Sequence, residues 1–487
     1  GGAGGAGMAF MGQGLTLANS GSITGGAGGT GGSVGAGGVG LVMMGGDTVD
    51  NSGSITGGMS GDGTTQADAI LASGAGNSLL LQSASTLSGN VEIAASSGLA
   101  IAPGAAGTLA NAIVMDDASS ALSFAKGSGD TLDVSGVISG AGAVTIADGA
   151  NVALSGANTY AGGTTIDGGS LSISSDAALG NTAGAITLTD NGSLETTADI
   201  ATTRSVTLGT GGGDISPDAG TTLSMVAPVG GAGGLTMDGA GTLVLEGTNT
   251  YTGATTISSG TLELSDLGSI ATSSGVVDNG TLDISGSSMW TNSITSLSGN
   301  GTVALGPELL QLTDASGTFS GVIADGGVAG GASGNLTLQG GTETLTGVNT
   351  YTGGTDISAG TLALAGSGSI ASSDQLLIES GSVFDISGTS AGASVTSVAD
   401  SDGTIALGGK TLTIGAGTSN VETPEMVFAG GATGNLVNEI FGQVVDGGIS
   451  GGVGGGLTLT NPAPSGSIVA TLLVGQNTKT GATTNEA

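Results

Sequence analysis

A stretch that occurs three times constrains the fold of this chain more than any other feature. The copies span residues 154–171, 245–262 and 345–362, and each contains the triplet Asn-Thr-Tyr. The aligned positions are Asn158 and Tyr160, Asn249 and Tyr251, and Asn349 and Tyr351, which include every tyrosine of the sequence. Self-similarity at a long period is typical of solenoids and arrays. The repeat therefore predicts one repeated structural unit rather than several unrelated globular domains.

A second, shorter repeat lies near the start of the chain. Residues 19–26 read Asn-Ser-Gly-Ser-Ile-Thr-Gly-Gly and recur as residues 51–58, an offset of 32. Such runs predict short strands between Gly, Ser and Asn turns, and we expect Gly-rich links such as residues 25–32 to be loops or mobile tips.

The two kinds of repeat suggest three regions. They are a Gly-rich N-terminal solenoid part with the 32-residue repeat (1–97), a β-helix with the three long repeats (98–409), and degenerate coils with a polar tail (410–487).

Composition narrows the type of solenoid. Glycine makes up 103 of the 487 residues and aromatic residues only 2%, so large side chains are too few for a wide core. Short strands with alternating apolar residues can supply the Val, Ile, Leu and Ala side chains of a narrow core. This pattern predicts an all-β fold, specifically a right-handed parallel β-helix. With roughly 20–25 residues per coil and about 4.7 Å between strands, we expect an elongated rod on the order of 100 Å long.

Charge and residue usage exclude several functions. The net charge is -34, with 38 acidic and only 4 basic residues, so the chain cannot offer the cationic contacts that nucleic acids and anionic membranes require. No apolar run approaches the about 20 residues of a membrane-spanning helix. Cysteine and histidine are absent, which excludes disulfides, thiol catalysis and the usual zinc sites. Acidic turns offer weak sites for Ca²⁺, and we expect no other cofactor.

No catalytic or cofactor-binding residues are predicted. The acid pairs Asp116-Asp117 and Asp400-Ser401-Asp402 are candidates for acid and base chemistry, but neighbouring carboxylates on one loop are usually solvated. A polysaccharide lyase also needs a basic residue near its acids, and Arg204 is the only arginine. We expect Trp290, the only tryptophan, to pack in the core or on a coil face.

The repeated Asn and Tyr residues are interpreted as structural positions rather than ligand contacts. Asparagine tolerates left-handed backbone geometry and fits a tight corner between coils. Tyrosine can cover small Gly and Ala faces with its ring while its hydroxyl remains in water.

The three copies resemble the passenger-associated transport repeat of bacterial autotransporters, whose pattern is close to Leu-x-Gly-x-Asn-Thr-Tyr-x-Gly-x-Thr-x-Ile-x-x-Gly-Thr-Leu. Departures from this pattern occur at Ala161 and Ser170 in the first copy and at Ala254 in the second. The resemblance extends over about residues 136–364. It implies a secreted β-helical passenger, extracellular or on the surface of a Gram-negative bacterium, that is exported through a C-terminal barrel. We expect no such barrel within this sequence, because no closing series of aromatic-flanked strands is found in it.

Three functional hypotheses follow. The leading one is a non-catalytic passenger that serves as an adhesin, a biofilm component or a stalk and binds a surface glycan or a protein receptor. The second is a self-assembling subunit of an extracellular fibre, sheath or surface layer, joined end to end or laterally, because an open strand edge can pair with another copy. The third is an enzyme acting on polysaccharide. We expect functional surfaces in the less regular ends, residues 1–97 and beyond residue 409.

Overall fold

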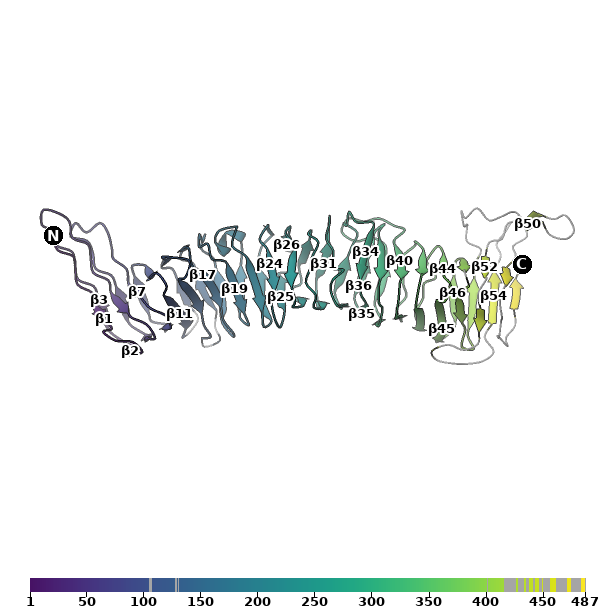
Figure 1. Ribbon diagram of the computed structural model, residues 1–487, viewed down its shortest axis with the longest axis horizontal. Coiled ribbons are helices and arrows are strands. Elements are labelled where there is room, and N and C mark those ends of the chain that lie inside the picture. Colours follow the sequence, from purple (N-terminus) through teal and green to yellow (C-terminus); the bar gives the residue numbers. More distant parts are fainter. Residues whose placement is uncertain are drawn as a thin grey trace. The chain divides into compact units, whose positions relative to one another are not determined.

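The computed structural model describes residues 1–415, apart from 105–106, 128, 130 and 401, together with residue 449 and short strands between residues 426 and 486. Its contacts divide the chain into two units, Gly1–Leu243 and Val244–Ala487. In both units short parallel strands stack on one another (Figure 1). The predicted all-β, parallel solenoid fold is therefore confirmed. Among the described residues, the helical element is one 3-10 turn, η1 (Asp176–Leu179).

The first unit is built from three main parallel sheets and two short ones. The longest contains β2 (Thr16–Asn19), β5 (Thr48–Asn51), β8 (Asn77–Leu81), β11 (Gly98–Pro103), β14 (Ala121–Phe124), β17 (Ala143–Ile146), β19 (Thr164–Asp167), β21 (Ile186–Thr189), β24 (Val206–Leu208) and β27 (Val229–Gly231). The second contains β12 (Gly107–Leu109), β15 (Leu132–Val134), β18 (Asn151–Leu154), β20 (Ser170–Ile173), β22 (Gly192–Thr196), β25 (Gly213–Pro217) and β28 (Leu235–Met237). The third contains β1 (Met8–Ala9), β4 (Leu41–Met43), β7 (Ile70–Ala72), β10 (Val91–Ile93), β13 (Ile113–Met115) and β16 (Ile138–Gly140). The short sheets pair β3 (Ser22–Thr24) with β6 (Ser54–Thr56) and β9 (Thr86–Ser88), and β23 (Ile200–Thr202) with β26 (Thr222–Met225).

The core of this unit is a narrow stack of aliphatic and aromatic side chains. Along the longest sheet, the inward residues that lie in register are Val49, Leu79, Ile101, Phe124, Ile146, Ile166, Leu188 and Leu208, all fully buried. Alternate residues of each strand point outward, so each short strand contributes only one or two side chains to the core. This explains how a chain with few large side chains still forms a continuous core.

The length of a coil changes along the first unit. In the first coil the chain runs from Thr16 to its neighbour in register, Thr48, whereas a later coil runs only from Val144 to Thr164. The repeat near the start of the chain is therefore one complete coil, and the side-chain amide of Asn19 donates to Asn51 Oδ1 over 2.7 Å. The coil length predicted from the sequence is too short for these first coils, so that prediction is wrong for them.

The Gly-rich links of the first coils are not loops, because they pack against one another as a hydrogen-bonded bundle. Residues 2–7, 25–29, 35–40 and 57–61 contribute. Gly26 N and Gly29 N donate to Gly5 O and Gly2 O over 2.8 Å each, and Gly38 N donates to Gly26 O over 2.8 Å. The donors Gly26 and Gly29 are three residues apart, and so are their acceptors Gly5 and Gly2. A period of three residues matches the turn of a polyproline II helix, whereas hydrogen bonds along a strand recur every two residues.

Glycine is required in this bundle by the close approach of the backbones. A Cβ atom on Gly38 would lie 2.1 Å from Gly5 O, whereas one on Gly5 would meet nothing within 4 Å. The expectation that residues 25–32 form loops or mobile tips is therefore wrong for residues 25–29. We call residues 2–7, 25–29, 35–40 and 57–61 the glycine bundle.

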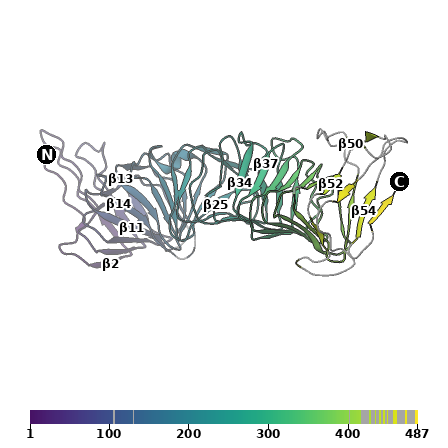
Figure 2. The same cartoon turned by 45° about the vertical axis from the view of Figure 1, so that its right-hand side comes forward.

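The second unit follows the same plan. One sheet contains β34 (Thr291–Ile294), β37 (Leu309–Leu312), β40 (Asn335–Leu338), β42 (Thr355–Ile357), β44 (Leu376–Ile378) and β47 (Val398–Asp400). Another contains β30 (Thr255–Ile257), β32 (Val276–Asp278), β35 (Leu297–Gly299), β38 (Thr318–Phe319), β41 (Thr342–Leu345), β43 (Thr361–Gly366), β45 (Val383–Thr389) and β48 (Thr404–Ala406). Smaller sheets join β31 (Thr261–Leu264), β33 (Thr281–Asp283), β36 (Thr302–Ala304) and β39 (Val322–Ala324), and β46 (Ala393–Val395) with β49 (Thr411–Ile414). Figure 2 shows β34 beside β37 within this unit.

Past residue 415 the described elements are short strands. They are β50 (Met426–Val427), β51 (Thr433–Gly434), β52 (Asn438–Ile440), β53 (Gln443–Val445), β54 (Gly456–Thr460), β55 (Thr471–Leu473) and β56 (Thr483–Glu486).

Two acidic side chains point into the core of the second unit. Glu343 in β41 is fully buried beside Leu362 of β43, and neither of its carboxyl oxygens has a hydrogen-bond partner. Asp278 in β32 is also fully buried; its Oδ1 accepts a hydrogen bond from Gly280 N over 3.1 Å. Burial raises the pKa of Glu343 to about 8 and that of Asp278 to about 7. Near neutral pH both carboxyl groups are therefore neutral acids to a large extent.

No helix in the described part of the chain is long and apolar enough to cross a membrane.

Candidate functional site

The repeated asparagines join successive coils through their side-chain amides. Asn158 Oδ1 accepts a hydrogen bond from Ile138 N of the preceding coil over 2.7 Å, and its Nδ2 donates to Ala178 O of the next coil over 2.6 Å. Asn349 makes the same pair of contacts, with Ile323 N at 2.9 Å and Ser369 O at 3.1 Å. Asn249 Nδ2 donates to Ser269 O over 3.0 Å.

The physical reason for asparagine at this position differs from the one expected. None of the three repeated asparagines has a positive φ angle, so left-handed backbone geometry does not explain them. An amide offers both an acceptor and donors on one short side chain, which lets it satisfy backbone groups of two neighbouring coils.

The repeated tyrosines are core residues with buried hydroxyl groups. Tyr160, Tyr251 and Tyr351 are at most 1% exposed, and each hydroxyl lies 2.6–2.7 Å from the Oγ1 of the threonine four residues later. The expectation that these hydroxyls remain in water is wrong. Burial raises the pKa of Tyr160 to about 12 and also raises the pKa of the other two phenols.

In the second and third copies the buried hydrogen bonds continue into the next coil. Thr355 Oγ1 lies 2.9 Å from Ser373 Oγ, which donates to Gly353 O over 2.8 Å. Thr255 and Ser273 repeat this arrangement at 3.0 Å. The Tyr-Thr-Ser series therefore joins a corner to the coil that follows, and its atoms are not accessible to a ligand.

Arg204, the only arginine, is also structural. It is 2% exposed, its Nε atom lies 2.8 Å from Asp176 Oδ1, and its Nη2 atom lies 3.1 Å from Asp176 Oδ2. Its guanidinium also donates to the carbonyl oxygens of Gly180, Asn181 and Gly184. Together these hydrogen bonds hold the η1 turn and the loop after it in place. With its donors occupied in this way, Arg204 is not available to act on a substrate.

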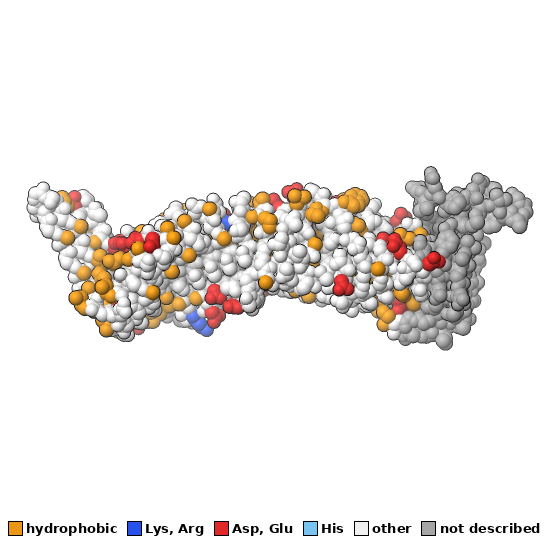
Figure 3. Space-filling model, in the orientation of Figure 1, with side chains coloured by type: hydrophobic (Ala, Val, Ile, Leu, Met, Phe, Trp, Pro, Cys, Tyr) orange, Lys and Arg blue, Asp and Glu red, His pale blue; other side chains and the backbone are white. Residues whose placement is uncertain are grey.

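Of the two acid pairs, the described one, Asp116-Asp117, lines none of the grooves found among the described residues. Asp117 accepts hydrogen bonds from Ser96 N at 3.2 Å and from Ser119 N at 3.0 Å, and these bonds, chiefly the one from Ser96, hold the pKa of Asp117 below its ordinary value. The other pair, Asp400-Ser401-Asp402, lies partly outside the described residues. On the face shown in Figure 3 the acidic side chains form small separate groups. Across the described part of the chain, no group of three or more acidic side chains is arranged to hold a metal ion, and the calcium expectation stays a prediction.

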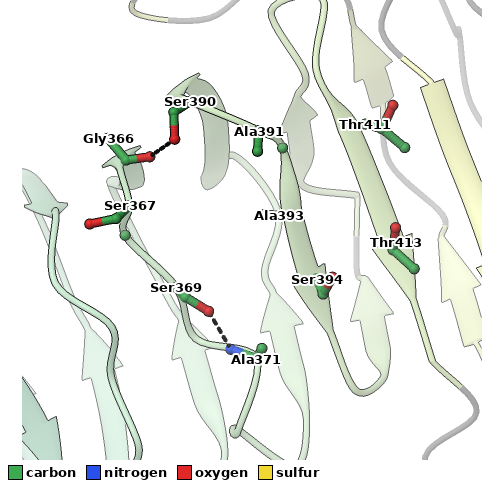
Figure 4. A pocket seen from close by; sticks show the side chains of 12 residues that line it. Gly366, Ser367, Ser369, Ala371, Ser390, Ala391, Ala393, Ser394, Thr411 and Thr413 are labelled. Carbon is green, nitrogen blue, oxygen red and sulfur yellow. Dashed lines mark hydrogen bonds between the residues drawn. The ribbon is translucent and has the colours of Figure 1, made fainter.

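A shallow groove of about 510 Å³ lies across three successive coils of the second unit. Figure 4 shows its lining, which consists of small and hydroxyl-bearing residues at 366–371, 390–394 and 411–413. Ser390 Oγ donates to Gly366 O over 2.8 Å, and Ala371 N donates to Ser369 Oγ over 3.2 Å. No titratable side chain lines this groove, so it can contact a polar ligand but offers no acid or base.

Coils of short parallel strands, joined at three Asn-Thr-Tyr corners, agree with what the resemblance to the class of autotransporter passenger repeats implies. The passenger-associated-transport-repeat family matches residues 139–173, 235–264 and 333–364, which confirms the resemblance seen in the sequence. Passengers of this class are extracellular or displayed on the surface of Gram-negative bacteria, and this location applies to the chain.

A curated relative agrees with this class. The chain is similar to the adhesin BmaC autotransporter of Brucella suis biovar 1 (strain 1330), with 35% identity over 226 residues. The match covers 44% of this chain and 6% of that adhesin, so the chain spans a small part of its relative's length. No solved structure matches the chain.

Proposed function

We propose that this chain contributes to adhesion as a non-catalytic part of a surface-displayed passenger. The observation that carries the proposal is the set of three passenger repeats in a chain similar to an autotransporter adhesin. The solenoid also suits this role, because its outward side chains form long polar faces while the repeated residues are used for the core and the corners.

The proposal is tested by measuring attachment directly. Beads coated with the purified chain are applied under flow to cultured epithelial cells, and the retained beads are counted. We expect more retention than with beads that carry an unrelated protein of matched net charge. Equal retention of the two bead types would contradict the adhesive role.

The absence of catalysis is part of this proposal. Its support is the lack of titratable residues in the groove of Figure 4 and the use of Arg204 and Asp117 in structural hydrogen bonds. We expect no release of reducing ends from a panel of neutral and acidic polysaccharides. Turnover that disappears in an Asp116→Asn, Asp117→Asn double variant would instead establish an enzyme.

A further inference from the structure

The only tryptophan of the chain is largely exposed on an outer sheet face. Trp290 was expected to pack in the core or on a coil face, yet 70% of its surface is accessible. It directly precedes β34 and lines a shallow groove of about 290 Å³. The groove floor is formed by outward residues of β37, β40, β42 and the start of β44. An indole that stays in water loses the large stabilisation that burial of its apolar surface would give. Its exposure here points to a ligand that covers it.

Polar groups surround the indole. Besides Trp290, the polar side chains that line the groove are those of Asn335, Thr337, Asp356 and Gln375, and the apolar ones are those of Leu309 and Leu377. An aromatic ring with carboxamide, hydroxyl and carboxylate groups around it matches a molecule with an apolar face and a hydroxylated rim. A pyranose ring has this chemistry, because its C–H groups form a flat face and its hydroxyls point outward.

Among the groove residues, Asp356 gives the strongest reason to expect a ligand that donates a hydroxyl hydrogen bond. Its Oδ2 accepts a hydrogen bond from Ser358 Oγ over 2.9 Å, whereas its Oδ1 is shielded from water and has no partner. A sugar hydroxyl bound beside Asp356 supplies the missing donor once the carboxylate rotates and turns Oδ1 toward the groove, because that oxygen has no surface open to solvent in this structure. At the matching position the other two repeats have Thr165 and Thr256, so this acceptor belongs to the third copy alone.

Charge decides which saccharides fit. No Lys or Arg lines the groove, Asp356 is acidic, and the whole chain has a net charge of -34. Uronic and sialic acids would be repelled and would find no cationic partner. The four neighbouring strands, spaced at about 4.8 Å, give the floor a length of about 14 Å, enough for a short oligosaccharide.

We propose that the groove between Trp290 and Asp356 is a binding site for neutral oligosaccharides, with a sugar ring stacked on the indole and a hydroxyl donated to the carboxylate. This proposal rests on the proposed adhesive function and names the class of its ligand. It places a binding surface in the regular repeats, not in the ends of the chain where we had expected function.

The single tryptophan makes the test specific to the site. The purified chain is titrated with cellohexaose, maltohexaose and mannohexaose, and with hexagalacturonate as an anionic probe, while Trp290 emission is recorded. We expect at least one neutral hexaose to shift the emission to shorter wavelength and hexagalacturonate to have no effect. By calorimetry, Trp290→Ala and Asp356→Leu should each weaken binding of that hexaose by about tenfold or more. Val348→Ala, at another exposed apolar residue outside the groove, should bind as the unaltered chain does.

Three results would overturn the saccharide site. The first is no emission change with any neutral hexaose, and the second is tighter binding of hexagalacturonate than of the neutral hexaoses. The third is a blue shift that grows with protein concentration in the absence of sugar, which would mean that a second copy of the chain covers Trp290. The bead assay separates this inference from the adhesive function. If Trp290→Ala beads attach as well as unaltered beads, adhesion stands and does not depend on the groove, and the titration alone decides whether the saccharide site exists. If unaltered beads do not attach, adhesion fails and the titration still decides the site.

Discussion

At the residue scale, the buried tyrosine hydroxyls make a clear prediction about stability. Replacing Tyr351 by Phe removes the hydrogen bond to Thr355, while Thr355 keeps its contact with Ser373. We expect a loss of about 1 kcal/mol in the free energy of unfolding, since one neutral hydrogen bond is lost and no polar atom is left without a partner. Denaturant titration followed by circular dichroism measures it. Thr355→Val, which also leaves the Tyr351 and Ser373 hydroxyls without this partner, should cost more; the opposite order would contradict the assigned geometry.

The core carboxyl of Glu343 predicts an unusual pH dependence. Burial raises its pKa from 4.5 to about 8, so the folded protein favours the neutral acid more than the unfolded chain does. The stability due to this group is therefore greatest below pH 4.5, falls as the pH rises, and is lost above about pH 8. The difference is on the order of 5 kcal/mol, because each unit of pKa corresponds to about 1.4 kcal/mol.

Substitution isolates this effect. Glu343→Leu should raise stability at pH 8 and make the decline between pH 5 and pH 8 less steep in denaturant titrations, with the part that is due to Asp278 remaining. Glu379→Gln, at an exposed position in the same unit, should leave that decline in place. An unchanged pH profile in Glu343→Leu would show that Glu343 is not the group responsible.

At the element scale, the glycine bundle predicts that neighbouring glycines tolerate substitution very differently. A methyl group on Gly38 would overlap Gly5 O, so Gly38→Ala should separate the packed segments and cost more than about 2 kcal/mol. Gly5→Ala places its methyl group in open space and serves as the matched control. Hydrogen exchange at the amides of Gly26, Gly29 and Gly35 gives the readout. Equal protection in the two variants would contradict the bundle.

The elements also show how far the sequence could predict this fold. The parallel solenoid was predictable because apolar residues recur with period two and the long repeat recurs with Asn349 and Tyr351 in place. The bundle was not predicted, because high glycine content is shared by loops and by closely packed backbones. A period of three in Gly1–Gly7 was the available signal.

Several side-chain environments were not predicted from the sequence. The burial of Glu343 could have been predicted, because aligning the second and third copies places Glu343 at the position of Leu243, which points into the core. The exposure of Trp290 had no comparable signal, because an indole is stable in a core and on a surface and only the fold decides between them. The buried role of Arg204 depends on η1, which no repeat predicts.

At the scale of the whole molecule, charge predicts the response to salt. A net charge of -34 with only 4 basic residues destabilises the compact state through mutual repulsion of the carboxylates. Raising the salt concentration from about 10 mM to about 1 M shortens the screening length from about 30 Å to about 3 Å. We therefore expect the melting temperature, followed by circular dichroism, to rise with NaCl, by about a few degrees.

Divalent ions separate general screening from a specific site. At equal ionic strength, MgCl₂ and CaCl₂ should act alike if the carboxylates respond only to screening. A calcium site at the acidic turns would add an increase in melting temperature that magnesium does not reproduce and that a chelator removes. A melting temperature that falls as NaCl is added would contradict the repulsion argument itself, because screening can only weaken the interaction between like charges.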